Sequence, residues 1–96
     1  MPTFGDRRIM GCSRSDLERW VAELMPGLAP SFDGNTLAVP LDGFAVTVSV
    51  RDAPPRSLGL IRFRELEVRF DYPQERADEA RAWIARFDRH TQRGGG

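Results

Sequence analysis

The sequence predicts an α+β two-layer sandwich, in which a mainly antiparallel sheet of three or four strands carries two helices on one face. Three observations lead to this fold. Two helical patterns lie toward the ends of the chain, a pair of alternating strand patterns surrounds Asp42-Gly43, and a further strand pattern precedes the second helix. Short connections favour antiparallel pairing, and the apolar stripes of the helices need a sheet face to cover. The expected order of elements is (β)-α-β-β-β-α.

The first helix is expected over residues 13–28, SRSDLERWVAELMPGL. Ser15 and Glu18 have the spacing of a capping box, which satisfies free amides of the first turn. Pro26-Gly27 ends the helix. Before it, we expect residues 1–6 to be irregular and residues 7–12 to form a short edge strand. Apolar residues at helical spacing form one buried stripe: Leu17, Trp20, Val21, Leu24 and Leu28.

Two strands with alternating polarity follow, in NTLAVPLDGFAVTVSV. The Asp42-Gly43 dipeptide between them predicts a two-residue hairpin loop of type I′. Pro40 has no amide proton to donate, so we expect its strand at an edge of the sheet. The loop length sets the register and puts one apolar set on a single face, with Leu41 opposite Phe44, Val39 opposite Val46, Leu37 opposite Val48, and Val50 beyond them.

The opposite face of this hairpin carries no charge and no large side chain. Exposed sheet faces usually carry charged residues, so this face is a candidate interface that a partner, a second copy or the chain's own termini would cover. A weakly hydrated surface with no partner is the alternative explanation. The face consists of Thr36, Ala38, Pro40, Ala45, Thr47 and Ser49.

The segment 51–57 is expected to be a loop, and residues 58–72 to form a strand whose alternation changes phase. A bulge or bend near Arg64-Glu65 accounts for the change without burying Arg62 and Arg64. Two short strands with a tight turn are the alternative, which we rank second because no turn residue is present. The inward set is Leu66, Val68, Phe70 and Tyr72, and the outward set is Arg62, Arg64, Glu65, Glu67, Arg69 and Asp71.

The last helix is expected over residues 73–93, with Pro73 in its first turn. Ala77, Ala80, Ile84 and Phe87 mark its buried stripe, Trp83 lies at the margin, and Thr91 continues the face. Residues 1–93 therefore make a single domain, followed by a flexible glycine tail over 94–96.

Composition excludes several classes of function. The chain has 96 residues, and its 14 basic and 14 acidic side chains balance, whereas a protein that coats nucleic acid needs a basic excess. All the basic residues are arginine; codon bias in a GC-rich bacterial genome is the favoured explanation, and recognition of phosphate or carboxylate by the guanidinium groups is the alternative. The single cysteine, Cys12, cannot form an internal disulfide. No apolar run is long enough to span a bilayer, so a cytoplasmic protein without membrane contact is expected.

Nothing in the sequence predicts catalysis, a cofactor or a metal site. Cys12 and His90 cannot form a zinc site by themselves, and the acidic residues are not clustered. The helix dipole beside Cys12 would lower the pKa of a thiol, but a packed, inert cysteine is the favoured interpretation.

A row of basic side chains on the last helix is a candidate contact for an anion or a partner: Arg86, Arg89, Arg93 and His90. Acidic residues gather at the start of this helix and arginines at its end, so stabilisation of the helix dipole is the favoured explanation.

We therefore expect a small, non-enzymatic protein-interaction module, and a homodimer is one form that it could take. A carrier-type protein that acts through Gly95-Gly96 is an alternative, because that tail has no side chains. Against it, the tail follows a helix rather than a strand, and a frayed helix end explains the glycines as well. Binding of nucleic acid or anions through arginines is a weaker alternative.

Overall fold

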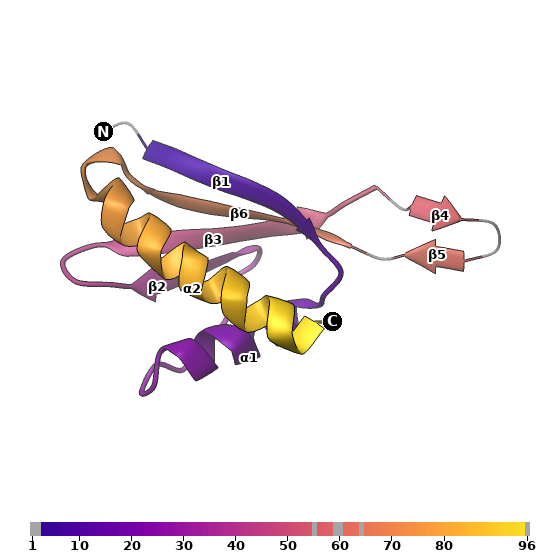
Figure 1. Ribbon diagram of the computed structural model, residues 1–96, viewed down its shortest axis with the longest axis horizontal. Helices are drawn as coiled ribbons and strands as arrows, with labels where there is room; N and C mark the ends of the chain where they lie inside the picture. The colour runs from indigo at the N-terminus through magenta and orange to yellow at the C-terminus, as the bar shows by residue number, and fades with distance from the viewer. Residues whose placement is uncertain (1–2, 55, 59–60, 64, 96) are drawn as a thin grey trace.

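The computed structural model describes the backbone of residues 3–54, 56–58, 61–63 and 65–95, and the side chains of residues 5–54 and 65–92. A four-stranded antiparallel sheet with two helices confirms the predicted α+β fold (Figure 1). The elements are β1 (Thr3–Met10), α1 (Arg14–Leu24), β2 (Thr36–Pro40), β3 (Ala45–Asp52), β4 (Arg56–Leu58), β5 (Ile61–Phe63), β6 (Leu66–Pro73), a 3-10 turn (Gln74–Arg76) and α2 (Ala77–Gly95).

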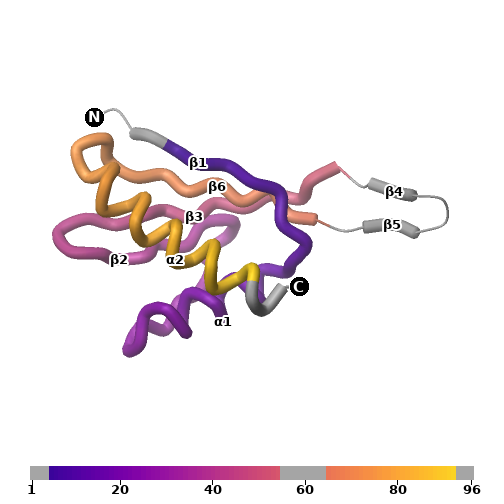
Figure 2. Tube along the Cα trace, in the orientation of Figure 1, coloured from indigo at the N-terminus to yellow at the C-terminus, as the bar shows by residue number. Residues whose placement is uncertain are grey.

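The order of strands in the sheet is β1-β6-β3-β2. Figure 2 shows β1 and β6 side by side, although they lie far apart in the sequence. Their pairing runs from Thr3 opposite Pro73 to Met10 opposite Leu66. The prediction of an irregular segment over 1–6 is therefore wrong from Thr3 onward, because β6 offers β1 a full-length ladder of backbone hydrogen bonds.

The hairpin register is confirmed, with Leu37 opposite Val48 and Val39 opposite Val46. The turn type is corrected: Gly43 has a φ of +81°, whereas no non-glycine residue in the described part of the chain has a positive φ. A type I′ turn needs a positive φ at both central residues, and a single one at the second position is the pattern of a type II turn. Arg76 donates a hydrogen bond to the Asp42 carbonyl, a tertiary contact that the local pattern does not encode.

Helix α1 is shorter than the predicted range of 13–28, since it runs from Arg14 to Leu24, and its N-cap lies two residues before the predicted one. Its N-cap is Ser13, whose hydroxyl accepts from the amide of Asp16 (3.1 Å), while the Asp16 carboxylate accepts from the amide of Ser13 (3.0 Å). The predicted box of Ser15 and Glu18 is therefore wrong. Glu18 instead accepts a hydrogen bond from the amide of Phe32 (2.8 Å) and so holds the loop between α1 and β2.

Both helices pack on the same face of the sheet, α2 across it and α1 beside α2 (Figure 1). Phe87 lies at the centre of this layer, with ring contacts to Trp20, Phe70 and Trp83. Trp83 is only 4% exposed, so its predicted place at the margin is wrong, because it stacks on Phe87 and meets the edge of Phe70. The predicted inward residues of the hairpin strands and of β6 are buried: Leu37, Val39, Val46, Val48, Val50, Leu66, Val68, Phe70 and Tyr72.

The region between β3 and β6 differs from the favoured prediction. Strand β3 continues to Asp52, and β4 and β5 pair with each other in a separate two-stranded sheet. The loop predicted over 51–57 is therefore wrong at both its ends, because β3 includes residues 51 and 52 and β4 starts at Arg56. The second-ranked alternative of two short strands is closer to the structure than one bulged strand, and β6 begins separately at Leu66. The side chains of Arg62 and Arg64 lie outside the described residues.

The last helix also starts later than predicted. Pro73 belongs to β6, and α2 proper begins at Ala77 after the 3-10 turn. Its buried stripe includes Ala80, Ile84 and Phe87, with Thr91 continuing it as predicted.

Candidate functional site

The predicted interface positions lie on the face of the sheet opposite the helices, which we call the outer face. Four of these side chains are exposed and those of Thr47 and Ser49 are half-buried. No described helix covers them, because both helices pack on the inner side. The structure therefore brings all six together on adjacent strands: Thr36, Ala38 and Pro40 on β2, and Ala45, Thr47 and Ser49 on β3.

The outer face continues onto β6 and β1, where arginines replace the small residues. Register places Arg69 between Ser49 on one side and Arg7 on the other. Arg51 lies beside Glu67 in the next row. This arginine cluster (Arg7, Arg51 and Arg69) was not anticipated, because only the pairing of β1 with β6 brings Arg7 next to the other two.

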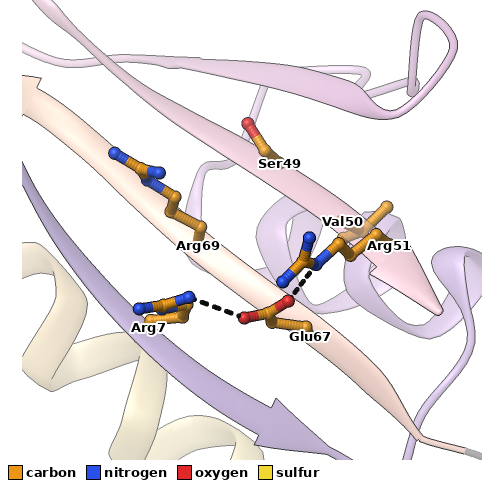
Figure 3. A pocket seen from close by; sticks show the side chains of 6 residues that line it. All are labelled: Arg7, Ser49, Val50, Arg51, Glu67 and Arg69. Atoms are coloured by element: carbon orange, nitrogen blue, oxygen red, sulfur yellow. Dashed lines mark hydrogen bonds and ion pairs between the residues drawn. The ribbon is translucent and has the colours of Figure 1, made fainter. Parts of the chain in front are cut away.

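Glu67 links two members of the arginine cluster (Figure 3). It accepts from Arg7 at 3.1 Å and pairs with Arg51 on its other side. The hydrogen bond from Arg51, followed by that from Arg7, lowers the pKa of Glu67, and the same bond raises the pKa of Arg51. Arg69 pairs with Asp71 at 2.9 Å. Three guanidinium groups thus face two carboxylates, which leaves a formal excess of one positive charge.

A shallow hollow of about 210 Å³ lies within the arginine cluster. Figure 3 shows the six side chains that line it, with Arg7 and Arg51 pointing toward Glu67 from opposite sides. Ser49 and Val50 complete its wall. Three guanidinium groups carry more hydrogen-bond donors than two carboxylates can accept, so the hollow suits an additional anionic oxygen.

The predicted basic row on α2 forms only part of an anion-binding site. Arg86, Arg89 and His90 line a shallow hollow with Leu24. However, Nε2 of His90 lies 2.6 Å from a carboxylate oxygen of Glu23 on α1. A carboxylate of the chain itself therefore already occupies part of the row. The side chain of Arg93 lies outside the described residues.

Cys12 packs against the edge of the core. It is half-buried against the core, and burial, with a smaller contribution from Asp16, raises the pKa of Cys12 to about 11. It lies in a hollow with Trp20, Thr91 and Gln92, so it is near the end of α2, while the ring of the adjacent His90 pairs with Glu23. A raised pKa opposes nucleophilic chemistry at neutral pH.

The remaining predicted features receive little structural definition. Helix α2 continues through Gly95, and Gly96 lies outside the described residues, so the action of Gly95-Gly96 as a carrier tail stays a prediction. Among the described residues, no group of three or more His, Cys, Asp or Glu side chains could hold a metal ion.

Comparison with protein-family models, with curated proteins and with solved structures found no match for this chain. Within the described part of the chain, no helix combines the length and apolar character needed to cross a membrane.

Proposed function

We propose that this chain is a small, non-enzymatic protein-interaction module whose binding surface is the outer face of its sheet. One observation carries the proposal: six neighbouring positions on β2 and β3 hold only Thr, Ser, Ala and Pro. Exposed sheet faces are usually polar and charged, and charged residues are depleted at the core of protein interfaces. Small side chains also lose little rotamer freedom when another protein packs on them.

The arginine cluster favours a partner that brings acidic side chains to the β1 and β6 side of this face. Arginine is enriched in interfaces because its planar group binds carboxylates through two donors. Arg7 and Arg51 are well exposed, with 64% and 73% of their side-chain surface accessible. A partner with a neutral centre and one or two carboxylates at its rim is therefore complementary to the outer face.

Homodimerisation forms part of the proposal, because the small, uncharged centre of the outer face is also able to pack on another protein surface of the same composition, such as a second copy of the chain. The single cysteine supports a reducing compartment, and the arginine-only basic composition supports a bacterial source, so we propose the bacterial cytoplasm as the place of action.

Affinity capture from the native host tests the outer face. The bait is compared with an Ala38→Glu/Ala45→Glu variant, and with an Ala82→Glu/Ala85→Glu variant that carries the same change on the exposed side of α2. We expect a stoichiometric partner with the wild type and the helix variant, and its loss with the sheet variant. A partner that binds the sheet variant equally well contradicts the proposal, as does the absence of any stoichiometric partner combined with a monomeric protein.

A further inference from the structure

The sheet has one edge that is long and unprotected. Strand β2 forms a short edge that ends at Pro40. Strand β1 forms the other edge, and it pairs with β6 along all eight of its residues without a bulge. Figure 1 shows β1 at the border of the sheet, with β6 on one side and no strand on the other. A long edge without proline or bulge presents backbone donors and acceptors to another strand.

Charged side chains alternate across β1. Asp6 and Arg8 lie opposite Phe70 and Val68, which face the helices, whereas Arg7 lies opposite Arg69 on the outer face. Charges that point inward on an edge strand normally exclude foreign strands. A second copy of β1 is an exception, because the acidic and basic residues of one copy then face those of the other.

Arg8 is incompletely satisfied within one copy. Its guanidinium lies 5.1 Å from the centre of the Phe70 ring and one terminal nitrogen pairs with Asp88. Its Nε is buried and has no hydrogen-bond partner among the described residues. An additional carboxylate on the inner side of β1 would provide an acceptor for this group.

We infer that β1 pairs with β1 of a second copy, antiparallel and centred on Arg7. In this register Asp6 lies opposite Arg8 of the second copy, and Arg8 lies opposite Asp6 of the second copy. Two pairs of opposite charges therefore form on the inner side, where cross-strand neighbours lie close enough to interact. Residues 4–10 are symmetrical about Arg7, so nearly the whole strand takes part.

Neighbouring registers are less favourable. Centring the pair on Asp6 places two carboxylates opposite each other, and centring it on Arg8 places two guanidinium groups opposite each other, which destabilises a sheet. A shift by one residue between these registers turns one copy over, because side chains alternate between faces. Such a shift leaves Arg8 without a facing carboxylate.

The outer side of the same register is also compatible with pairing. Ile9, an apolar side chain that is 53% exposed, lies opposite Gly5 of the second copy. Gly5 has no side chain of its own, and the neighbouring Asp71 carboxylate lies 2.8 Å from the position that a Cβ would take there, so Ile9 packs beside this carboxylate. Arg7 meets Arg7 of the second copy, which is unfavourable by itself. Each of these arginines already pairs with its own Glu67, and this pairing offsets the repulsion.

The resulting dimer is one continuous sheet of eight strands, twice the four of a single copy. Because inner sides stay together, both outer faces point in the same direction. The dimer therefore doubles the surface that a partner would meet. The biological meaning of this pairing rests on the proposed function.

Charge exchange tests the pairing in the purified full chain. We expect wild-type protein to form, at rising concentration, a species of twice the 10.8 kDa chain mass in light scattering. Asp6→Arg alone and Arg8→Asp alone should each weaken dimerisation about tenfold or more, because like charges then face each other at two places. An equal mixture of the two variants should restore the dimer, since every facing pair is again opposite in charge.

The mixture also controls for folding, because a misfolded variant cannot be rescued by its counterpart. A monomeric wild type at all concentrations overturns the inference, and so does a mixture that stays monomeric while both variants keep the wild-type circular dichroism spectrum.

Cross-linking tests the centre of the register. In a Cys12→Ser background, Arg7→Cys should give an oxidised dimer, because the two copies of this position face each other. Ile9→Cys is the matched control on the same strand and face, and should remain monomeric under oxidation. If the wild type dimerises but Arg7→Cys gives no cross-link, and if Ala38→Glu/Ala45→Glu abolishes the dimer, the edge pairing is overturned. The same result would support the outer face as the binding surface of the proposed function. If Arg7→Cys forms the cross-link but no partner is captured, the edge pairing is supported and the proposed function is overturned.

Discussion

Phe87 joins the three parts of the core, so its replacement tests the packing of the fold. Its ring centre lies 6.5 Å from that of Trp20 on α1, 5.3 Å from that of Phe70 on β6 and 5.7 Å from that of Trp83 on α2. It is 1% exposed. Removing a buried phenylalanine costs about 3–5 kcal/mol, whereas a domain of this length has a total stability of about 5–14 kcal/mol. Phe87→Ala should therefore remove about a quarter or more of the total stability, and at the lower end of this range it would unfold the protein.

Phe87→Leu gives a change that is easier to measure. Leucine keeps most of the apolar volume but loses the ring contacts, and we expect a loss of about 2 kcal/mol in the free energy of unfolding. For a domain of this size that loss lowers the Tm by about 8–16 °C.

Thermal and urea unfolding, followed by circular dichroism and tryptophan fluorescence, measure this effect. Trp20 and Trp83 both contact Phe87, so the emission reports directly on the site. Arg86→Ala, an exposed neighbour on α2, is the control and should change stability by less than about 0.5 kcal/mol. If Phe87→Leu is no more destabilising than this control, the central role of Phe87 in the core is refuted.

Four further predictions concern single residues. Cys12 should react with iodoacetamide about 100-fold more slowly than a free thiol below pH 9, because a pKa near 11 rather than 9.0 reduces the thiolate; equal rates would contradict the burial of this thiol. The same shift makes native stability fall as the pH rises from 9 toward 11, since only the unfolded thiol has then lost its proton, and Cys12→Ser should remove this part of the pH dependence in urea titrations. Gly43→Ala should destabilise by about 1 kcal/mol, because its φ is positive and Arg76 lies 3.3 Å from the added methyl position, whereas Gly11→Ala meets no atom within 4 Å and should cost less. Ser13→Ala should cost about 1 kcal/mol of stability and Ser15→Ala almost nothing, since only the first caps α1; the opposite ranking in chemical denaturation would restore the capping box expected from the sequence.

Local patterns in the sequence predicted the structure correctly where one interaction dominates. Alternation around Asp42-Gly43 predicted the hairpin register, because a one-residue slip would expose Val39 and Val46. Where two local solutions have similar energies, the prediction failed. Ser13 and Ser15 both precede an acidic residue by three positions, and in the structure Glu18 accepts from the amide of Phe32 while Asp16 closes the box with Ser13.

The candidate site, too, was predicted from the sequence only where local patterns define it. The six small residues of the outer face were predicted from strand alternation alone, whereas the arginine cluster required knowing that β1 pairs with β6. Arg7 and Glu67 are 60 residues apart, and no local signal reports their contact. The basic row on α2 was visible in the sequence, but its partial neutralisation by Glu23 was not.

The sequence by itself therefore determined the α+β class, the face that each strand of the hairpin buries and the apolar stripes of both helices, because these depend on periodicity and on turn residues within a few positions. The order β1-β6-β3-β2, the burial of Trp83 and the free edge at β1 were decided only by the tertiary structure. The physical reason is that strand pairing between distant segments depends on the whole packed sheet, in which β6 pairs with a neighbour on each side and β1 pairs on one side only.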